Sequence, residues 1–438
     1  MARPNTCYLP VIIVLFLLLG CKCRSDHSAA GDGEKLLAAK HDWGNPRQLV
    51  SWDPVAAADH CSWKGVVCAG GVGVVTELSL QGLSLTGSVP ASVCELKNLH
   101  RLDLSYNNLT GAFPAATLYA CAQLRFLDIS FNSFTGVLPD HVDALSPVME
   151  HLNLSSNSFG GVVPAAVARL PALKSLLLDN NRFTGAYPAA EISELSDLEV
   201  LTLAFNAFSP APAPPEFAKL TKLTYLWMEK INLIGEIPEA YASLTELTVL
   251  AMSSNNLTGS IPAWVWHLRK LEFLYLYANA LSGELTRDVT AVNLVELDVS
   301  TNQLTGEIPE AFGKLRNLEV MFLYENHFTG AIPAGIGLLP RLADIRIFIN
   351  WFSGELPAEL GKHSPLRELQ VANNNLSGPL RETLCANRKL TVIAAFNNSF
   401  SGSLPANLGN CILLDYLALD DNQLSGTLPA DIKQAFPS

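Results

Sequence analysis

Residues 247–262 read LTVLAMSSNNLTGSIP, and closely similar lines recur from residue 75 to the C-terminus. Leucine-type side chains fall at positions 247, 250, 252 and 257, an asparagine at 255, a glycine at 259 and a proline at 262. With the asparagine as the marker of each copy, fifteen copies follow one another at intervals of 23 to 25 residues. Thirteen copies keep the asparagine, and Leu83 and Ile231 replace it in the other two. The markers stand at 83, 107, 132, 157, 181, 206, 231, 255, 279, 302, 326, 350, 374, 398 and 422.

A repeat of this length and pattern is typical of leucine-rich repeats. Each copy is expected to form one coil of a solenoid, in which the L-x-L segment pairs in parallel with the coils on either side. The leucines point into the coil, because one repeat alone has no neighbours against which to bury them. The sequence therefore predicts an α/β solenoid, a superhelix of about 15 repeats with a parallel sheet on its concave face.

The other recurring residues fit the same coil. The marker asparagine is expected to bond backbone groups at the bend after the strand, where the ladder of the sheet has ended. The glycine permits a turn with positive φ, and the proline fixes the chain after a second short extended segment. Between the leucines, three side chains per repeat point outward. A parallel sheet left uncovered on this face is a surface available to a partner.

The chain divides into three parts. Residues 1–23 resemble a secretory signal, with an apolar run too short to span a bilayer; residues 24–74 form an N-terminal cap, and residues 75–438 the repeats. The net charge is −12, which argues against nucleic acid as a partner. No other stretch is long and apolar enough for a membrane helix. The scattered histidines form no catalytic grouping, so we expect no enzymatic activity, no cofactor and no metal.

The cysteines suggest disulfides. Cys61 and Cys68 lie in the cap, close enough to close a small loop; a zinc site is the alternative, but no second Cys/His pair is placed to complete four ligands. Outside the signal segment four further cysteines occupy similar positions on adjacent coils, so bridges are expected on the convex side between Cys94 and Cys121 and between Cys385 and Cys411. Buried free thiols are the alternative for these four.

Five N-x-S/T sequons predict glycosylation. They are Asn108, Asn153, Asn256, Asn375 and Asn397. Asn153 lies four residues before its marker, a position on the concave face, so a glycan there would screen the fourth repeat from a large partner.

Aromatic residues gather on part of the concave face. The outward positions lie two, four and six residues before each marker; repeats 1–6 place one aromatic residue there, Phe126, and repeats 7–12 place eight. The clustering can be explained by packing of the rings on one another across parallel strands, without any ligand. Tyr and Trp are, however, favoured binding anchors. Glu229 and the single base Arg346 lie in the same window. The sequence predicts a groove for an extended peptide, with basic peptide residues near the carboxylates. The predicted groove residues are Tyr225, Trp227, Phe273, Tyr275, Tyr277, Glu296, Asp298, Phe322, Tyr324, Asp344, Arg346 and Phe348.

The arrangement W…C-x-W-x-G-V-x-C of the cap, followed by repeats ending in T/S-G-x-[IL]-P, resembles the ectodomains of plant leucine-rich-repeat receptor kinases. Within these the chain most resembles HAESA-type peptide-hormone receptors, particularly their grass relatives. The shared features cover residues 33 to 438 and include the irregular sixth repeat, residues 206–215, and Leu226-Trp227 of the seventh. The resemblance implies a secreted peptide ligand, with a leucine-rich-repeat co-receptor kinase as a possible second partner. It also implies that Trp227 contributes to the peptide groove. Such receptors hold the peptide's carboxylate with an Arg-x-Arg pair, but the corresponding strand here reads Tyr416-Leu417-Ala418, so Arg346 is a candidate substitute.

Relatives of this type continue into a second cap, a membrane helix and a cytoplasmic kinase, none of which is evident before Ser438. The function expected is therefore ligand binding at the extracellular face of the plasma membrane or in the apoplast, by a truncated receptor or a soluble decoy. The alternative is a secreted inhibitor of microbial wall-degrading enzymes, a class that is typically shorter and carries a C-terminal cysteine cap.

Overall fold

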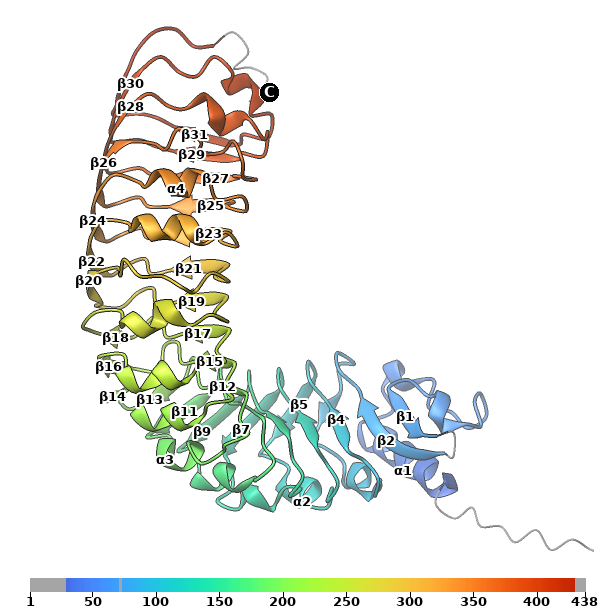
Figure 1. The fold of residues 1–438 in the computed structure, drawn as a ribbon. Helices are drawn as coiled ribbons and strands as arrows, with labels where there is room; N and C mark the ends of the chain where they lie inside the picture. Colours follow the sequence, from blue (N-terminus) through green and yellow to red (C-terminus); the bar gives the residue numbers. More distant parts are fainter. Residues whose placement is uncertain (1–28, 71–72, 430–438) are drawn as a thin grey trace, which may run out of the picture.

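The computed structural model describes residues 29–70 and 73–429, so the predicted signal peptide lies outside the described residues. The chain forms the predicted solenoid, an arc with one long sheet on its inner side and shorter strands on its outer side (Figure 1). In the view of Figure 1, the stack of N-terminal coils extends across the picture, and the stack of coils from β15 onward rises upward. We number the coils 1 to 15 by their marker residues, so that coil 8 contains Asn255.

The inner sheet has 16 strands, of which β1 is antiparallel to β2 and all later neighbours are parallel. Its fifteen parallel strands supply one strand to each coil, which confirms the predicted repeat count. The strands are β1 (Val66–Ala69), β2 (Val74–Ser79), β4 (Arg101–Asp103), β6 (Phe126–Asp128), β8 (His151–Asn153), β10 (Ser175–Leu177), β12 (Val200–Thr202), β15 (Tyr225–Trp227), β17 (Val249–Ala251), β19 (Phe273–Tyr275), β21 (Glu296–Asp298), β23 (Val320–Phe322), β25 (Asp344–Arg346), β27 (Glu368–Gln370), β29 (Val392–Ala394) and β31 (Tyr416–Ala418).

The leucines between the outward positions form the core. Leu226, Leu250 and Leu274, for example, are neighbours in the ladder and are fully buried. A second column of phenylalanines lies two residues after the markers, where Phe134 and Phe159 stack 6.0 Å apart. Each fully buried side chain of this size contributes about 1.5–3 kcal/mol to folding, and it is buried only because a neighbouring coil covers it.

The marker asparagines join each coil to the one before it. Asn302 is representative: its Nδ2 donates to Leu276 O on the preceding coil at 3.0 Å, and to Val299 O and Ser300 O on its own coil. Its Oδ1 accepts a bond from Leu281 N on the preceding coil at 3.0 Å. The side chain is 8% exposed, so it satisfies backbone groups that water does not reach.

In the two coils without a marker asparagine, the N–H group of the residue at that position donates to the marker asparagine of the next coil. Asn255 Oδ1 accepts bonds from both Ile231 N and Leu233 N, at 3.1 and 3.0 Å. Asn107 Oδ1 does the same for Leu83 N and Leu85 N. A single missing asparagine is therefore tolerated, because the amide of the following coil accepts the additional N–H group.

The outer strands form three separate sheets of six, three and seven strands. The first break lies in the irregular sixth repeat, where β13 pairs back to β11 and β14 pairs forward to β16. The second break lies between β18 and β20. The strands are β3 (Thr86–Gly87), β5 (Asn108–Gly111), β7 (Ser133–Val137), β9 (Ser158–Gly161), β11 (Arg182–Gly185), β13 (Ala207–Phe208), β14 (Ala211–Pro212), β16 (Leu233–Gly235), β18 (Asn256–Leu257), β20 (Ser282–Glu284), β22 (Gln303–Gly306), β24 (His327–Gly330), β26 (Trp351–Glu355), β28 (Asn375–Gly378), β30 (Ser399–Gly402) and β32 (Gln423–Leu424).

Short helical turns close the convex side of most coils, and they begin directly after a proline in coils such as 8 and 10. The proline has no N–H to leave unpaired at such a start. The α-helices are α1 (Ala29–Asp42), α2 (Ala115–Leu118), α3 (Ala189–Ile192) and α4 (Ala334–Gly337). The 3₁₀ turns are η1 (Arg47–Leu49), η2 (His60–Ser62), η3 (Ala91–Glu95), η4 (Val142–Ala144), η5 (Ala165–Arg169), η6 (Pro215–Lys219), η7 (Glu239–Ser243), η8 (Ala263–His267), η9 (Glu310–Lys314), η10 (Glu382–Cys385) and η11 (Leu408–Asn410).

The N-terminal cap covers the first coil with α1 and two tryptophans. Trp52 and Trp63 stack with ring centroids 6.1 Å apart and are buried. Each indole N–H donates to a backbone carbonyl, Trp52 to Lys64 O at 2.9 Å and Trp63 to Ala57 O at 3.0 Å. The apolar edge of coil 1 is thereby removed from water.

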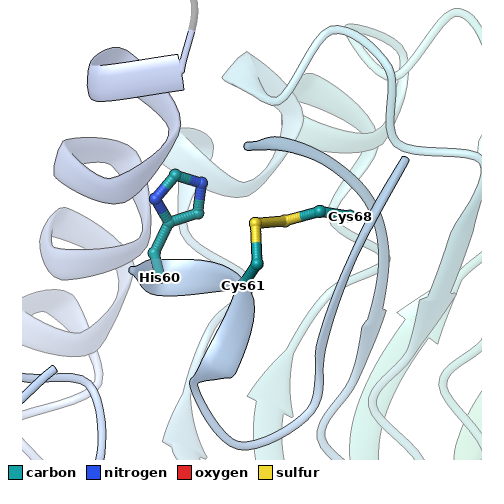
Figure 2. A group of neighbouring side chains, drawn as sticks. All are labelled: His60, Cys61 and Cys68. Carbon is teal, nitrogen blue, oxygen red and sulfur yellow. A yellow bond between two sulfur atoms is a disulfide. The ribbon is translucent and has the colours of Figure 1, made fainter. Parts of the chain in front are cut away.

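The six cysteines of the described residues form the three expected pairs, Cys61–Cys68, Cys94–Cys121 and Cys385–Cys411. Figure 2 shows the cap bridge with His60 beside it. These three residues lie close enough together to suggest a metal site, but both sulfur atoms are already bonded to each other. His60 Nε2 lies 2.8 Å from Gly73 O, so the imidazole also has a partner.

Replacement of Asn302 by alanine should destabilise the solenoid by about 3 kcal/mol, because several buried backbone groups lose their partner. Amide hydrogen exchange should show faster opening of coils 9 and 10, and thermal unfolding should begin at a lower temperature. The control is Gln303→Ala, since this neighbouring side chain is exposed. Equal exchange in the two variants would contradict the role assigned to the asparagine.

Candidate functional site on the concave face

The predicted groove residues lie on the inner strands of coils 7 to 12. Tyr225 and Trp227 lie on β15, Phe273 and Tyr275 on β19, and Phe322 on β23. All of these side chains are half-buried. The outward residues of the intervening coil 8 are Val249, Ala251 and Ser253, and the last two are small and buried. The aromatic residues lie on coils 7, 9, 11 and 12 of this face, and coil 10 between them carries Glu296 and Asp298. We call this set of aromatic residues the aromatic patch. Its members are Tyr225, Trp227, Phe273, Tyr275, Tyr277, Phe322, Tyr324 and Phe348.

Carboxylates lie among these rings and are bonded to them. Glu229 is the centre of one cluster: Tyr277 Oη donates to its Oε1 at 2.5 Å, although the two residues are two coils apart. Trp227 Nε1 donates to Glu229 Oε2 at 3.1 Å. Ser253 occupies the same position on the coil between them, and its hydroxyl is buried with no hydrogen-bond partner among the described residues. The small size of Ser253 leaves room for the bond between Tyr277 and Glu229 to pass over this coil.

A second pair of carboxylates lies on β21. Tyr275 Oη donates to Glu296 Oε2 at 2.5 Å. Asp298 Oδ1 accepts bonds from Ser300 N and Ser300 Oγ, at 3.0 and 2.6 Å. The short-range donors to Glu229, Glu296 and Asp298 are thus neutral groups, and none of the three forms an ion pair with a described residue. Their negative charge is not neutralised by a basic side chain within ion-pair distance.

Burial controls the titration of these groups. It raises the pKa of the Tyr275 and Tyr277 hydroxyls, and their bonds to Glu296 and Glu229 raise it further. The tyrosines therefore remain protonated donors at any physiological pH. Burial also raises the pKa of Asp298, partly opposed by its bonds to Ser300. A cation beside Asp298 would relieve this penalty, because an opposite charge favours the ionised form.

At the far end of the patch, on coil 12, the charged residues are paired with one another. Arg346 Nε and Nη2 donate to Asp344 at 3.0 and 2.8 Å, Nη2 also lies 2.9 Å from Glu368 Oε2, and the guanidinium stacks over Phe322. Arg346 is therefore already paired, which argues against its prediction as a substitute carboxylate binder. Asp344 is 9% exposed and neutralised, so the prediction that it meets a basic residue of the ligand is also not supported. Tyr324 and Phe348 stack 4.5 Å apart beside them.

The N-terminal half of the concave face is polar and its groups bond one another. Asp103, Asp128 and Asn153 each accept bonds within their own coil, in the same way as Asp298. Phe126, the one aromatic residue expected here, lies between Arg101 and His151, with the guanidinium 3.5 Å from its centroid. These coils present few unsatisfied groups, which separates them from the aromatic patch.

The predicted glycan at Asn153 is not supported by this geometry. The side chain is 9% exposed, and Nδ2, the atom that carries an N-linked glycan, donates to Asp128 Oδ2 at 2.9 Å. The concave position thus placed the sequon inside a hydrogen-bond network. The other four sequon asparagines, Asn108, Asn256, Asn375 and Asn397, are exposed.

Phe205 is an addition to the patch that sequence reasoning missed. It lies immediately before the marker of coil 6, with φ of 53°, and its ring meets Trp227 edge-on at 5.8 Å. Lys230 Nζ lies 5.9 Å from the same ring. The repeat pattern gave the position of Phe205, one residue before the marker, but that position was not counted among those that face the concave side.

Comparison with known proteins supports this description. The model of the leucine-rich-repeat N-terminal domain matches residues 29–69, and leucine-rich-repeat models match residues 98–117, 122–183, 246–268 and 293–315. The receptor protein kinase EMS1 of Arabidopsis thaliana is 36% identical over 95 residues, which are 22% of this chain and 8% of EMS1. The receptor-like kinase SIK1 of rice is 41% identical over 75 residues, 17% of this chain and 7% of SIK1. The matched stretches are thus less than a tenth of these relatives.

Solved structures match over most of the chain. The Arabidopsis receptor kinase HAESA, in complex with the peptide hormone IDA and the co-receptor SERK1, has a TM-score of 0.88 and 34% identity, covering 92% of this chain and 67% of that one. A TDR receptor has a TM-score of 0.76 and 32% identity, covering 82% and 66%. The plant peptide hormone receptor RGFR1, in complex with RGF2, has a TM-score of 0.70 and 27% identity, covering 83% and 66%.

The fold and the cap define a leucine-rich-repeat protein of the plant type. The chain belongs to the family of plant leucine-rich-repeat receptor ectodomains. The residues that the structure describes form such an ectodomain alone, with no kinase domain among them. None of the helices in the described part has the length and apolar character required to cross a bilayer.

Replacement of Asp298 by asparagine should stabilise the unliganded protein at neutral pH. Because burial raises the pKa of Asp298 in the folded state, folding carries a penalty wherever this group is ionised, and the penalty is lost as the pH falls through the raised pKa. The asparagine Oδ1 still accepts both bonds from Ser300. The temperature of the unfolding midpoint should be higher for Asp298→Asn than for the wild type at pH 7. The two midpoints should become equal as the pH is lowered into the acid range. The exposed Asp420→Asn is the control; an equal effect there would refute this account.

Proposed function

We propose that this chain recognises an extended secreted peptide along the aromatic patch of coils 7 to 12, as the extracellular ligand-binding region of a plant cell-surface receptor. The observation that carries the proposal is the group Glu229, Glu296 and Asp298, three half-buried carboxylates held by neutral donors between aromatic rings. A ligand that fits it brings apolar residues for the rings and a basic residue for the carboxylates.

The structure favours an extended ligand over a globular one. The patch crosses successive parallel strands, which lie about 4.8 Å apart, so an extended peptide lying across them passes roughly one strand per one to two residues. Rigid aromatic side chains lose little conformational entropy on binding, which makes them effective anchors. HAESA and RGFR1, the solved relatives in complex with peptide hormones, support the peptide class over the alternative of an inhibitor of wall-degrading enzymes.

The same relatives suggest a second protein partner for the complex of this chain with its peptide. The HAESA structure contains the co-receptor SERK1, and we extend to this chain the expectation of a leucine-rich-repeat co-receptor kinase that joins the complex once the peptide is bound. Signalling would then be performed by kinase domains outside the described residues, and this chain would supply recognition on the extracellular side.

Loss of one anchor tests the position of the groove. Isothermal calorimetry with the peptide hormone IDA and a panel of other secreted plant peptides would identify a ligand of the secreted chain. Trp227→Ala and Tyr275→Ala should each lower the affinity for that ligand by roughly 30-fold, the loss typical of a central anchor. Phe126→Ala is the matched control, because it removes a concave aromatic residue outside the patch and should leave affinity unchanged. Unchanged affinity in both patch variants would mean that the peptide lies elsewhere.

The charge of the ligand can be tested separately. Glu229→Gln should weaken a peptide that carries a basic residue by about tenfold, the order of a charge-assisted hydrogen bond. The same peptide with that residue changed to glutamine should bind wild type and Glu229→Gln alike. Additive effects of the two changes would show that Glu229 does not contact the basic residue.

A further inference from the structure

Two exposed aromatic residues lie outside the groove and have no role in it. Tyr106 and Phe131 are 57% and 45% exposed, and their rings stack 4.1 Å apart with an interplanar angle of 8°. Each immediately precedes a marker asparagine, and each has positive φ, 55° and 50° respectively. Aromatic rings in such exposed positions expose apolar area to water without contributing to the core, which suggests a further contact.

The coils on either side leave the outer faces of this ring pair open. The residue at the same position on coil 1 is Gly82, where even an added Cβ would have no heavy atom within 4 Å. On coil 4 the position is Ser156, which has only a short side chain. The outer face of Tyr106 is therefore free for a flat apolar surface, and Phe131 supports the ring from the other side.

A sequon begins two residues after Tyr106. Asn108, Leu109 and Thr110 form N-L-T, and Asn108 is exposed while the intervening Asn107 is buried. Tyr106 and Asn108 thus flank the buried Asn107, and both side chains are open to solvent. Phe131 is tied to this turn as well, because its carbonyl accepts a bond from Asn107 N at 3.1 Å. The ring pair and the glycan acceptor thus share one turn of the chain.

We propose that Asn108 carries an N-linked glycan whose first N-acetylglucosamine packs against Tyr106, with Phe131 behind it. In the attachment step, Asn108 Nδ2 bonds to C1 of the sugar and loses a proton, and the pyrophosphate of a lipid-linked oligosaccharide donor leaves with the bonding electron pair. The C–H groups on one face of a pyranose ring make dispersion contacts with an aromatic face, and both surfaces lose water. The glycan covers the ring pair, and the ring pair holds the glycan against the rim of coil 2.

The chain contains a matched comparison for this site. Residues 254–258 read S-N-N-L-T and residues 106–110 read Y-N-N-L-T, so the two sequons differ only in the residue before the marker. Asn256 is exposed, as Asn108 is, but Ser254 offers no ring. A glycan at Asn256 therefore has the same local backbone and lacks the packing surface.

The test uses the full chain secreted from mammalian cells, with peptide-N-glycosidase digestion of the native protein followed by peptide mass spectrometry at each sequon. Release from Asn108 should be about fivefold slower than release from Asn256, since a packed ring contact of ~1 kcal/mol changes the freely accessible population by that factor. Tyr106→Ser should bring the two rates together. Its thermal midpoint should be insensitive to removal of the Asn108 glycan, whereas the wild-type midpoint should fall by about 1–2 °C.

Either of two results would overturn the proposal. One is an unoccupied Asn108 in a protein whose Asn256 carries a glycan. The other is release at equal rates from the two sites in the wild-type protein, a measurement that does not depend on whether Tyr106→Ser folds. Binding of a peptide in the groove is a separate readout, since Tyr106 and Phe131 lie on coils 2 and 3.

Discussion

The structure depends on the amide that joins one coil to the next. Every marker asparagine donates to a carbonyl of the preceding coil and to two of its own, and its oxygen accepts an N–H group of the preceding coil, as shown for Asn302 and again at Asn422. The strands of the inner sheet are only about three residues long, so the ladder alone leaves much of each coil without partners. The asparagine fixes the bend at which the chain leaves the sheet, and this bend decides that the side chains before it, two, four and six residues earlier, face the concave side.

The coil itself could be predicted almost completely from the sequence, because its spacing reflects burial. Leu226, Leu250 and Leu274 have to be buried wherever they stand, and the pairing of Cys94 with Cys121 follows once they lie on adjacent coils. The left-handed backbone before each marker could not be predicted. It occurs at Tyr106, Phe131 and Ile349 as readily as at Gly82, so residue type gives no indication of it. The conformation is imposed by the bend, and its cost is offset by the asparagine bonds that the bend permits.

For the residues of the proposed groove, the repeat pattern predicted the inner face and the coils on which they lie, but not the hydrogen-bond partners of each side chain. That Arg346 would be occupied by Asp344 and Glu368 depends on rotamers and on the spacing of three adjacent strands, which repeat periodicity does not specify. The same holds for Asn153. The repeat pattern places its side chain on the outward side of the strand, but its amide nitrogen donates a hydrogen bond to Asp128. The bond between Tyr277 and Glu229 spans a whole coil, and it is possible only because Ser253 on that coil is small. Contacts between outward side chains that are two coils apart cannot be predicted from a repeat pattern, because the pattern describes each coil separately.

The outer sheet is divided at a place where the inner sheet is not. In the irregular sixth repeat, β13 pairs only with β11 and β14 only with β16, so the outer strands lose their continuity there. Between coils 8 and 9, backbone bonds from Ala280 N to Leu257 O and from Ser282 N to Gly259 O, each 2.8 Å long, still join the outer edge. On the inner side, β12 and β15 pair in regular register across the irregular repeat. The irregular loop is therefore accommodated at the outer edge, and the backbone that carries Trp227 keeps the geometry of a regular coil.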